Sequence, residues 1–126
     1  MLNGFHWLLD LGDCRGDAAL LTHHAQLRAF CLRACADAGL VTLGDVFHQF
    51  QPQGVTGVVL LAESHMAVHT WPELGAVTLD VYVCNFGADN SGRAQALLDD
   101  LVQAFAPARV ERHRIVRGAR TPLAPA

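Results

Sequence analysis

The sequence predicts an α+β fold, a two-layer sandwich in which a mainly antiparallel sheet carries two helices on one face. Three observations predict it. Several segments alternate apolar and polar residues with a period of two, two longer segments have a helical period, and 52% of the 126 residues are apolar. Because no repeat, linker or low-complexity stretch divides the chain, we expect residues 1–126 to form a single domain.

The first half of the chain predicts a strand, a helix and a hairpin. Residues 5–11 alternate apolar and polar side chains, as a half-buried strand does. Residues 17–38 repeat apolar positions at helical spacing and end at a glycine, which suits a helix end. Residues 41–50 and 55–62 are apolar, β-branched runs joined by the turn sequence of residues 51–54, so they predict a hairpin.

The second half predicts two further strands, a helix and a last strand. Residues 65–70 alternate, and Pro72 then favours an extended bend. Residues 76–84 give the clearest strand, with every second side chain apolar. Residues 90–105 predict an amphipathic helix and residues 108–117 a final strand. The expected order is therefore β-α-β-β-β-α-β.

Two helices are enough to cover only one face of such a sheet. The polar residues of the strands occupy the alternate positions whose side chains are expected to point to the other face. They are His6, Asp10, His65, His69, Asp80, Tyr82 and Cys84. Polar and reactive side chains from several strands on one face indicate a reactive surface that a partner subunit seals. The high apolar content of so short a chain also favours burial of surface in an oligomer.

Charge and hydropathy exclude several classes of partner. A net charge of -3 gives no reason to expect nucleic-acid or membrane binding, and the arginines near the C-terminus have no aromatic residues among them. We therefore interpret that cluster (Arg109, Arg112, Arg114, Arg117 and Arg120) as a solvated edge strand and tail. No apolar run approaches a membrane span and no signal-peptide pattern is present, so we expect a cytoplasmic protein.

The chain contains no lysine. This excludes pyridoxal-phosphate chemistry, which holds its cofactor on a lysine, and a P-loop, whose lysine reaches the phosphates. The four cysteines are expected to be free thiols. Cys31 and Cys35 follow His23 and His24 at a spacing that suits zinc poorly, and Cys31 continues a helical apolar stripe, so we expect no metal.

Residues 50–84 carry a distinctive pattern. Glu63-Ser64-His65 stands close before the run His69-Thr70-Trp71-Pro72-Glu73, and both lie between residues 52–59 and residues 80–84. At this spacing the chain resembles the prokaryotic S-adenosylmethionine decarboxylase family. Gly4-Phe5-His6, with Asp10 and Cys14 after it, is similar to the opening strand of the family, and residues 47–50 to its second strand.

The resemblance implies an S-adenosylmethionine decarboxylase-like fold and a proenzyme that cuts itself between Glu63 and Ser64. Residues 1–63 would form a β chain, and residues 64–126 an α chain that begins with a covalent pyruvoyl group made from Ser64. His69 matches the processing histidine of the family. Thr56 stands where the family usually has serine and is expected to support processing.

The resemblance also implies roles in turnover. Cys84 matches the acid that returns a proton to the substrate α-carbon, Phe50 an aromatic that stacks on adenine, and Glu73 a carboxylate that holds the ribose hydroxyls. The implied reaction is decarboxylation of the small molecule S-adenosylmethionine for spermidine biosynthesis. The implied assembly is a homo-oligomer, a dimer of αβ protomers with active sites at the interface.

One departure from the family pattern leaves alternatives open. The family commonly continues with glycine after the cysteine, whereas this chain has Asn85-Phe86-Gly87. Some members use the same pyruvoyl chemistry on ornithine or arginine, so this remains an alternative. A second alternative is an uncleaved, non-catalytic homologue.

Overall fold

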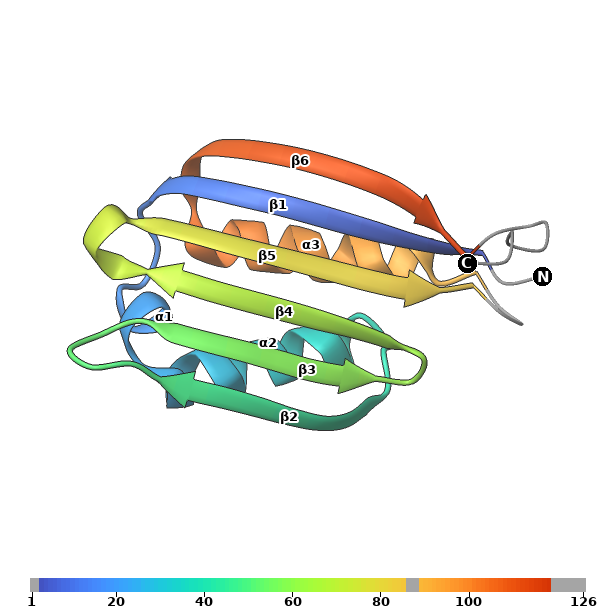
Figure 1. Ribbon diagram of the computed structural model, residues 1–126, viewed down its shortest axis with the longest axis horizontal. Coiled ribbons are helices and arrows are strands. Elements are labelled where there is room, and N and C mark those ends of the chain that lie inside the picture. The colour runs from blue at the N-terminus through green and yellow to red at the C-terminus, as the bar shows by residue number, and fades with distance from the viewer. Residues whose placement is uncertain (1–2, 86–88, 119–126) are drawn as a thin grey trace, which may run out of the picture.

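The computed structural model describes residues 3–85 and 89–118. It confirms the predicted α+β sandwich: six antiparallel strands form one sheet in the order β2-β3-β4-β5-β1-β6, with helices on one face (Figure 1). The elements are β1 (Gly4–Cys14), α1 (Ala19–Thr22), α2 (His24–Asp37), β2 (Thr42–Gln49), β3 (Val55–Leu61), β4 (Ser64–Trp71), η1 (Pro72–Leu74), β5 (Ala76–Cys84), α3 (Ser91–Phe105) and β6 (Pro107–Arg117).

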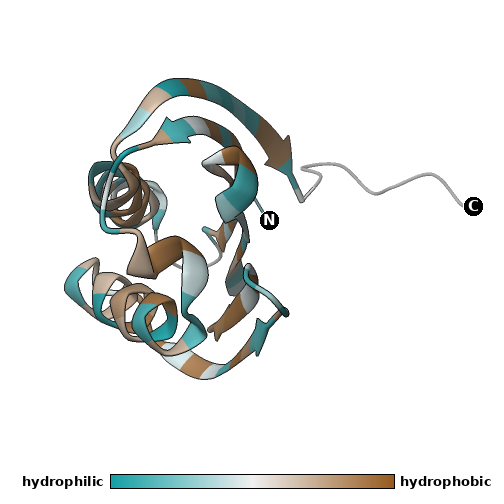
Figure 2. Cartoon of the chain, turned by 90° about the vertical axis from the view of Figure 1, so that its left-hand side faces the viewer, coloured by the Kyte–Doolittle hydropathy of each residue, from teal (hydrophilic) through white to brown (hydrophobic). Residues whose placement is uncertain are grey.

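The hydrophobic core lies between the sheet and the helices. Figure 2, viewed along the layers, shows the helices together on one side of a curved sheet. Every second residue of β5 is buried, as its alternation predicts, and so is the apolar stripe predicted for the second helix. These buried residues are Val77, Leu79, Val81 and Val83 on β5, and Ala94, Leu97, Leu98, Leu101 and Phe105 on α3. None of the described helices is long and apolar enough to cross a bilayer.

The single helix predicted over residues 17–38 is wrong in one respect. The chain breaks at His23, whose backbone is extended (φ -123°, ψ 118°), so α1 and α2 are separate helices. The side chain of Gln49 on β2 satisfies both polar groups at the break. Its Oε1 accepts from the His24 N–H at 2.8 Å, and its Nε2 donates to the Thr22 carbonyl at 2.8 Å. A distant side chain therefore stabilises a break that local periodicity does not reveal.

The bend predicted at Pro72 is confirmed only in its first residue. Trp71 is extended (φ -125°, ψ 84°), as expected before proline. Pro72, however, begins the 3-10 turn η1, where its missing N–H has no intrahelical partner to lose. Gly75 ends that turn with a φ of 62°, a left-handed conformation that glycine adopts without steric cost.

Thr70 joins three elements inside the core. It is only 5% exposed, its hydroxyl donates to the Leu21 carbonyl at 2.7 Å, and the same oxygen accepts from the Val55 N–H at 2.9 Å. One side chain thereby satisfies a carbonyl at the end of α1 and an amide at the start of β3. Loss of the hydroxyl would leave two backbone groups without this partner.

We predict that Thr70→Val lowers the free energy of unfolding by about 1–3 kcal/mol, because valine keeps the shape but leaves buried polar groups unpaired. Chemical denaturation followed by circular dichroism measures this change. Thr42→Val, at an exposed position on β2, is the control and should shift the midpoint much less. Equal shifts for the two variants would contradict the role assigned to Thr70.

Candidate active site

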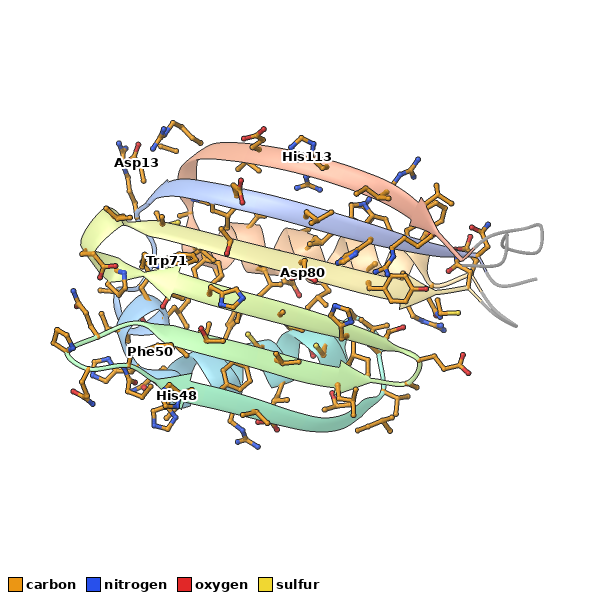
Figure 3. The ribbon with its side chains drawn as sticks, in the orientation of Figure 1. Asp13, His48, Phe50, Trp71, Asp80 and His113 are labelled. Atoms are coloured by element: carbon orange, nitrogen blue, oxygen red, sulfur yellow. The ribbon has the colours of Figure 1, made fainter. Side chains whose placement is uncertain are left out.

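The sheet face opposite the helices carries the polar side chains that the sequence placed there. The strand register aligns them in rows: His6 and His65 both lie opposite Tyr82, Gly4 lies opposite Cys84, and His69 lies opposite Thr56. Figure 3 views this open face. Asp80 lies on β5, and Trp71 and Phe50 lie toward the end where β4 leaves the sheet.

Ser64 and Cys84 come together at one end of the sheet, where β4 begins and β5 ends. Ser64 is the first residue of β4, directly after a tight turn from β3, and its Oγ accepts a hydrogen bond from the Cys84 N–H at 3.2 Å. Glu63, which precedes Ser64, has a φ of 56°. A glutamate in this left-handed region is strained, by about 1–3 kcal/mol for such conformations in general. The peptide bond between Glu63 and Ser64 therefore lies at a strained turn, beside a hydrogen-bonded hydroxyl.

Thr56 and His69 come together toward the other end of β4. They lie opposite each other in the β3–β4 register, and the Thr56 Oγ1 and His69 Nδ1 atoms are 2.9 Å apart. Both line a pocket of about 240 Å³ with Phe50, Trp71 and Glu73. The residues that the family resemblance assigns to the substrate thus share one pocket with those assigned to processing.

These two groups of residues are distant within one chain. Ser64 and His69 are five residues apart on the same extended strand, which at roughly 3.3 Å per residue separates them by about 16 Å. The His69 of one chain therefore cannot contact Ser64 of the same chain. The structure therefore holds the predicted site residues in two separate groups, called here half-sites: one with Ser64 and Cys84, the other with Phe50, Thr56, His69 and Glu73.

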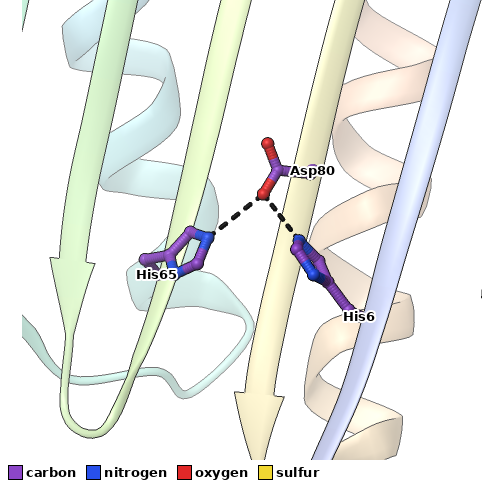
Figure 4. Close-up of side chains that lie close together, drawn as sticks. All are labelled: His6, His65 and Asp80. Carbon is purple, nitrogen blue, oxygen red and sulfur yellow. Dashed lines mark hydrogen bonds and ion pairs between the residues drawn. The ribbon is translucent and has the colours of Figure 1, made fainter. Parts of the chain in front are cut away.

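A third cluster was not predicted from the sequence. His6, His65 and Asp80 come from three adjacent strands, and both imidazole Nε2 atoms lie close to the same Asp80 Oδ2, at 2.8 Å and 3.1 Å (Figure 4). The sequence placed all three residues on the open face. Their contact depends on the register of β1, β5 and β4, which the sequence pattern does not give.

The other cysteines are not part of this face. Cys31 and Cys35 are buried in the core, as the apolar stripe predicted for Cys31. Burial raises the pKa of the Cys35 thiol to about 11, and burial together with Cys35 also raises the pKa of Cys31. Such thiols stay protonated and unreactive at neutral pH.

The sequence departure after Cys84 is described only in part. The Asn85 side chain accepts from the Asn90 N–H, and the Asn90 side chain donates to the Cys84 carbonyl, both at 2.8 Å. These contacts connect the end of β5 to the start of α3. Phe86, Gly87 and Arg120 lie outside the described residues.

The sequence profile of the family described as S-adenosylmethionine decarboxylase matches residues 5–118. The chain belongs to this family. A family enzyme of known structure, the adenosylmethionine decarboxylase from Aquifex aeolicus VF5, superposes with a TM-score of 0.83 at 34% sequence identity, covering 98% of this chain and 97% of that one. This confirms the S-adenosylmethionine decarboxylase-like fold that the resemblance implied.

Curated relatives agree with the family assignment. The S-adenosylmethionine decarboxylase proenzyme of Synechococcus sp. (strain WH7803) is 43% identical over 98 residues, 78% of this chain and 75% of that protein. The proenzyme of Parasynechococcus marenigrum (strain WH8102) is 40% identical over 112 residues, 89% of this chain and 80% of that protein.

The Thr56–His69 contact leads to a prediction for the self-cleavage that family membership implies. Thr56→Val should slow cleavage about tenfold or more, because it removes the hydroxyl that orients the imidazole, while Thr56→Ser should retain most of the rate. Gel analysis of chain length against time measures the rate. Thr78→Val, opposite His69 on the β5 side, is the matched control. Unchanged cleavage in Thr56→Val would show that the hydrogen bond has no part in processing.

Proposed function

We propose that this chain is the proenzyme of a pyruvoyl-dependent decarboxylase that acts on S-adenosylmethionine. Family membership supports the reaction, and one observation in the structure supports the site. Ser64 stands at a strained turn with its Oγ on the Cys84 amide, so the serine assigned to the cofactor lies beside the cysteine assigned to proton return. The product, decarboxylated S-adenosylmethionine, would be the aminopropyl donor for spermidine.

Self-cleavage would begin with the Ser64 hydroxyl. Its oxygen attacks the Glu63 carbonyl, and the peptide bond becomes an ester as the Ser64 nitrogen takes up a proton. Loss of the α-proton and of the Glu63 carboxylate then leaves dehydroalanine at residue 64, and water converts this to a ketone with release of ammonia. Because a serine hydroxyl is a weak nucleophile, both steps need a group that moves protons, which is the role assigned to His69.

The residues around Ser64 fit a pyruvoyl group. The Cys84 N–H, which now donates to the Ser64 Oγ, is a backbone donor fixed by the sheet and available to an oxygen at residue 64. When present, such a group withdraws the electrons released as carbon dioxide leaves the substrate. Cys84 follows as the residue placed to return a proton to the substrate α-carbon.

The pocket at the other end supports recognition of the nucleoside. Phe50 is 47% exposed and presents an aromatic ring suited to stacking on adenine. Glu73 contributes a carboxylate that can accept hydrogen bonds from both ribose hydroxyls. Ornithine and arginine have neither an adenine nor a ribose, so this pocket favours S-adenosylmethionine over them.

A complete site would combine two copies of the chain. The half-site with Ser64 and the half-site with His69 lie about 16 Å apart on one strand, so a second copy in the opposite orientation can bring one against the other. The open face between them carries the exposed apolar side chains of Val46, Val58 and Leu60. Face-to-face association of two copies would cover this patch, which supports a dimer of αβ protomers.

Two substitutions separate cleavage from turnover. Ser64→Ala should remain a single 13.6 kDa chain, because no nucleophile remains, whereas Cys84→Ala should still cleave but decarboxylate at least about 100-fold more slowly. Intact mass reports cleavage, and release of labelled carbon dioxide from S-adenosylmethionine, ornithine and arginine reports turnover. A wild-type chain that never cleaves, or that prefers an amino acid without a nucleoside, would overturn the proposal.

A mixed dimer tests the shared site. Ser64→Ala and His69→Ala should each fail to cleave, yet on co-expression about a quarter of all chains should be cut, because half of the dimers are mixed and each contains one complete site. Mass spectrometry identifies which chain is cut, and only the His69→Ala chain should be. No cleavage in the mixture would exclude a site built from two copies.

A further inference from the structure

A chain of hydrogen bonds crosses four strands of the open face and ends at His65, the residue after Ser64. The Arg117 Nη1 on β6 lies 3.2 Å from the His6 Nδ1 on β1, and the His6 Nε2 lies 2.8 Å from the Asp80 Oδ2 on β5. The His65 Nε2 on β4 lies 3.1 Å from the same oxygen. His65 is the immediate neighbour of Ser64. No role in the proposed reaction has been assigned to any of these four side chains.

The chemistry of arginine fixes the direction of these bonds. A guanidinium can only donate, so the His6 Nδ1 must accept from Arg117, and the His6 proton lies on Nε2. That Nε2–H then donates to Asp80, and the His65 Nε2–H donates to the same carboxylate oxygen. The Asp80 Oδ2 thus accepts two hydrogen bonds from imidazoles on the two neighbouring strands. Side-chain exposures of 16% for His6, 26% for Asp80 and 36% for His65 limit competition from water.

Cleavage changes what holds the start of β4. In the intact chain the turn through Glu63 ties Ser64 to β3. After cleavage, residue 64 would be covalently attached only to His65, at the free end of a strand. Ends of strands fray at little cost in free energy. A cofactor at that end needs a fixed position, since displacements of about 1 Å are enough to impair catalysis.

We propose that the Asp80 carboxylate, held by His6, clamps the His65 side chain and so fixes the cofactor-bearing end of β4 once the chain has been cut. This inference rests on the proposed self-cleavage. His6, Asp80 and His65 are positioning residues that act through the backbone of His65. The clamp connects this end to β5 and β1, which the cut does not touch.

The same three side chains have the composition of a metal site, with their ligand atoms within 4.8 Å of one another. The hydrogen bonds favour a clamp over a metal. With its Nδ1 accepting from Arg117, His6 carries its proton on the Nε2 that faces Asp80, and metal binding at that atom would have to displace the proton. The guanidinium on the His6 Nδ1 also places a positive charge next to the cluster.

The clamp is tested by its dependence on cleavage. Asp80→Asn is made in the wild-type chain and in the uncleavable Ser64→Ala chain, and amide hydrogen exchange is measured at residues 65–68. In the cut protein, Asp80→Asn should speed exchange there about tenfold, because a charge-assisted hydrogen bond is lost at a free strand end. In the uncut protein the effect should be less than about twofold, because the turn still holds the strand.

Two further variants complete the experiment. Asp10→Asn removes an exposed carboxylate from the same face on β1 and should leave exchange at residues 65–68 unchanged. His6→Gln weakens the clamp while keeping Asp80, and should give an intermediate increase in the cut protein. It provides the comparison if Asp80→Asn does not fold or cleave.

The outcomes distinguish the clamp from the proposed function. A wild-type chain that stays uncut overturns both. A wild-type chain that cuts normally, with equal exchange increases in the cut and uncut backgrounds or with none in either, overturns the clamp alone. Zinc that protects residues 65–68 in the wild type but not in Asp80→Asn, at stoichiometric concentration, would replace the clamp with a metal site.

Discussion

The pairing of β4 on both of its edges is the constraint on which the rest of the structure depends. Along nearly its whole length the strand is bonded to β3 on one side and to β5 on the other. A chain cut immediately before this strand loses one connection but keeps two hydrogen-bonded ladders. A proenzyme of this fold can therefore break its own backbone at Ser64 and still remain one folded body.

The same strand also sets the distance between the chemical groups. An extended backbone cannot shorten, so Ser64 at the start of β4 and His69 five residues later stay far apart in one chain. Cys84 is near the first because it ends β5, which runs antiparallel to β4, and Thr56 is near the second because it lies near the start of β3, which also runs antiparallel to β4. The rigidity that would keep a cut protein together also keeps the two half-sites of one copy apart.

Because all the helices cover one face of the sheet, the other face stays open. The apolar side chains of each strand point mainly into the core, and the open face carries imidazoles and carboxylates together with exposed valine and leucine side chains. Partial burial strengthens the hydrogen bonds of His6 and His65 with Asp80, and closure by a second copy would strengthen them further by excluding water. Association and positioning of the cofactor would then support each other.

The sequence by itself determined the fold class, the buried faces of β5 and α3, and the hairpin of β2 and β3. Periods of two and 3.6 residues and short turn motifs are local properties of a chain, so they can be recognised without the tertiary structure. Tertiary structure alone decided three features: the separation of Ser64 from His69, the convergence of His6 and His65 on Asp80, and the helix break at His23. The break depends on the side chain of Gln49, which lies on a distant strand. Each of these depends on how distant strands are aligned, and alignment between strands is fixed by packing of the whole sheet rather than by any one segment.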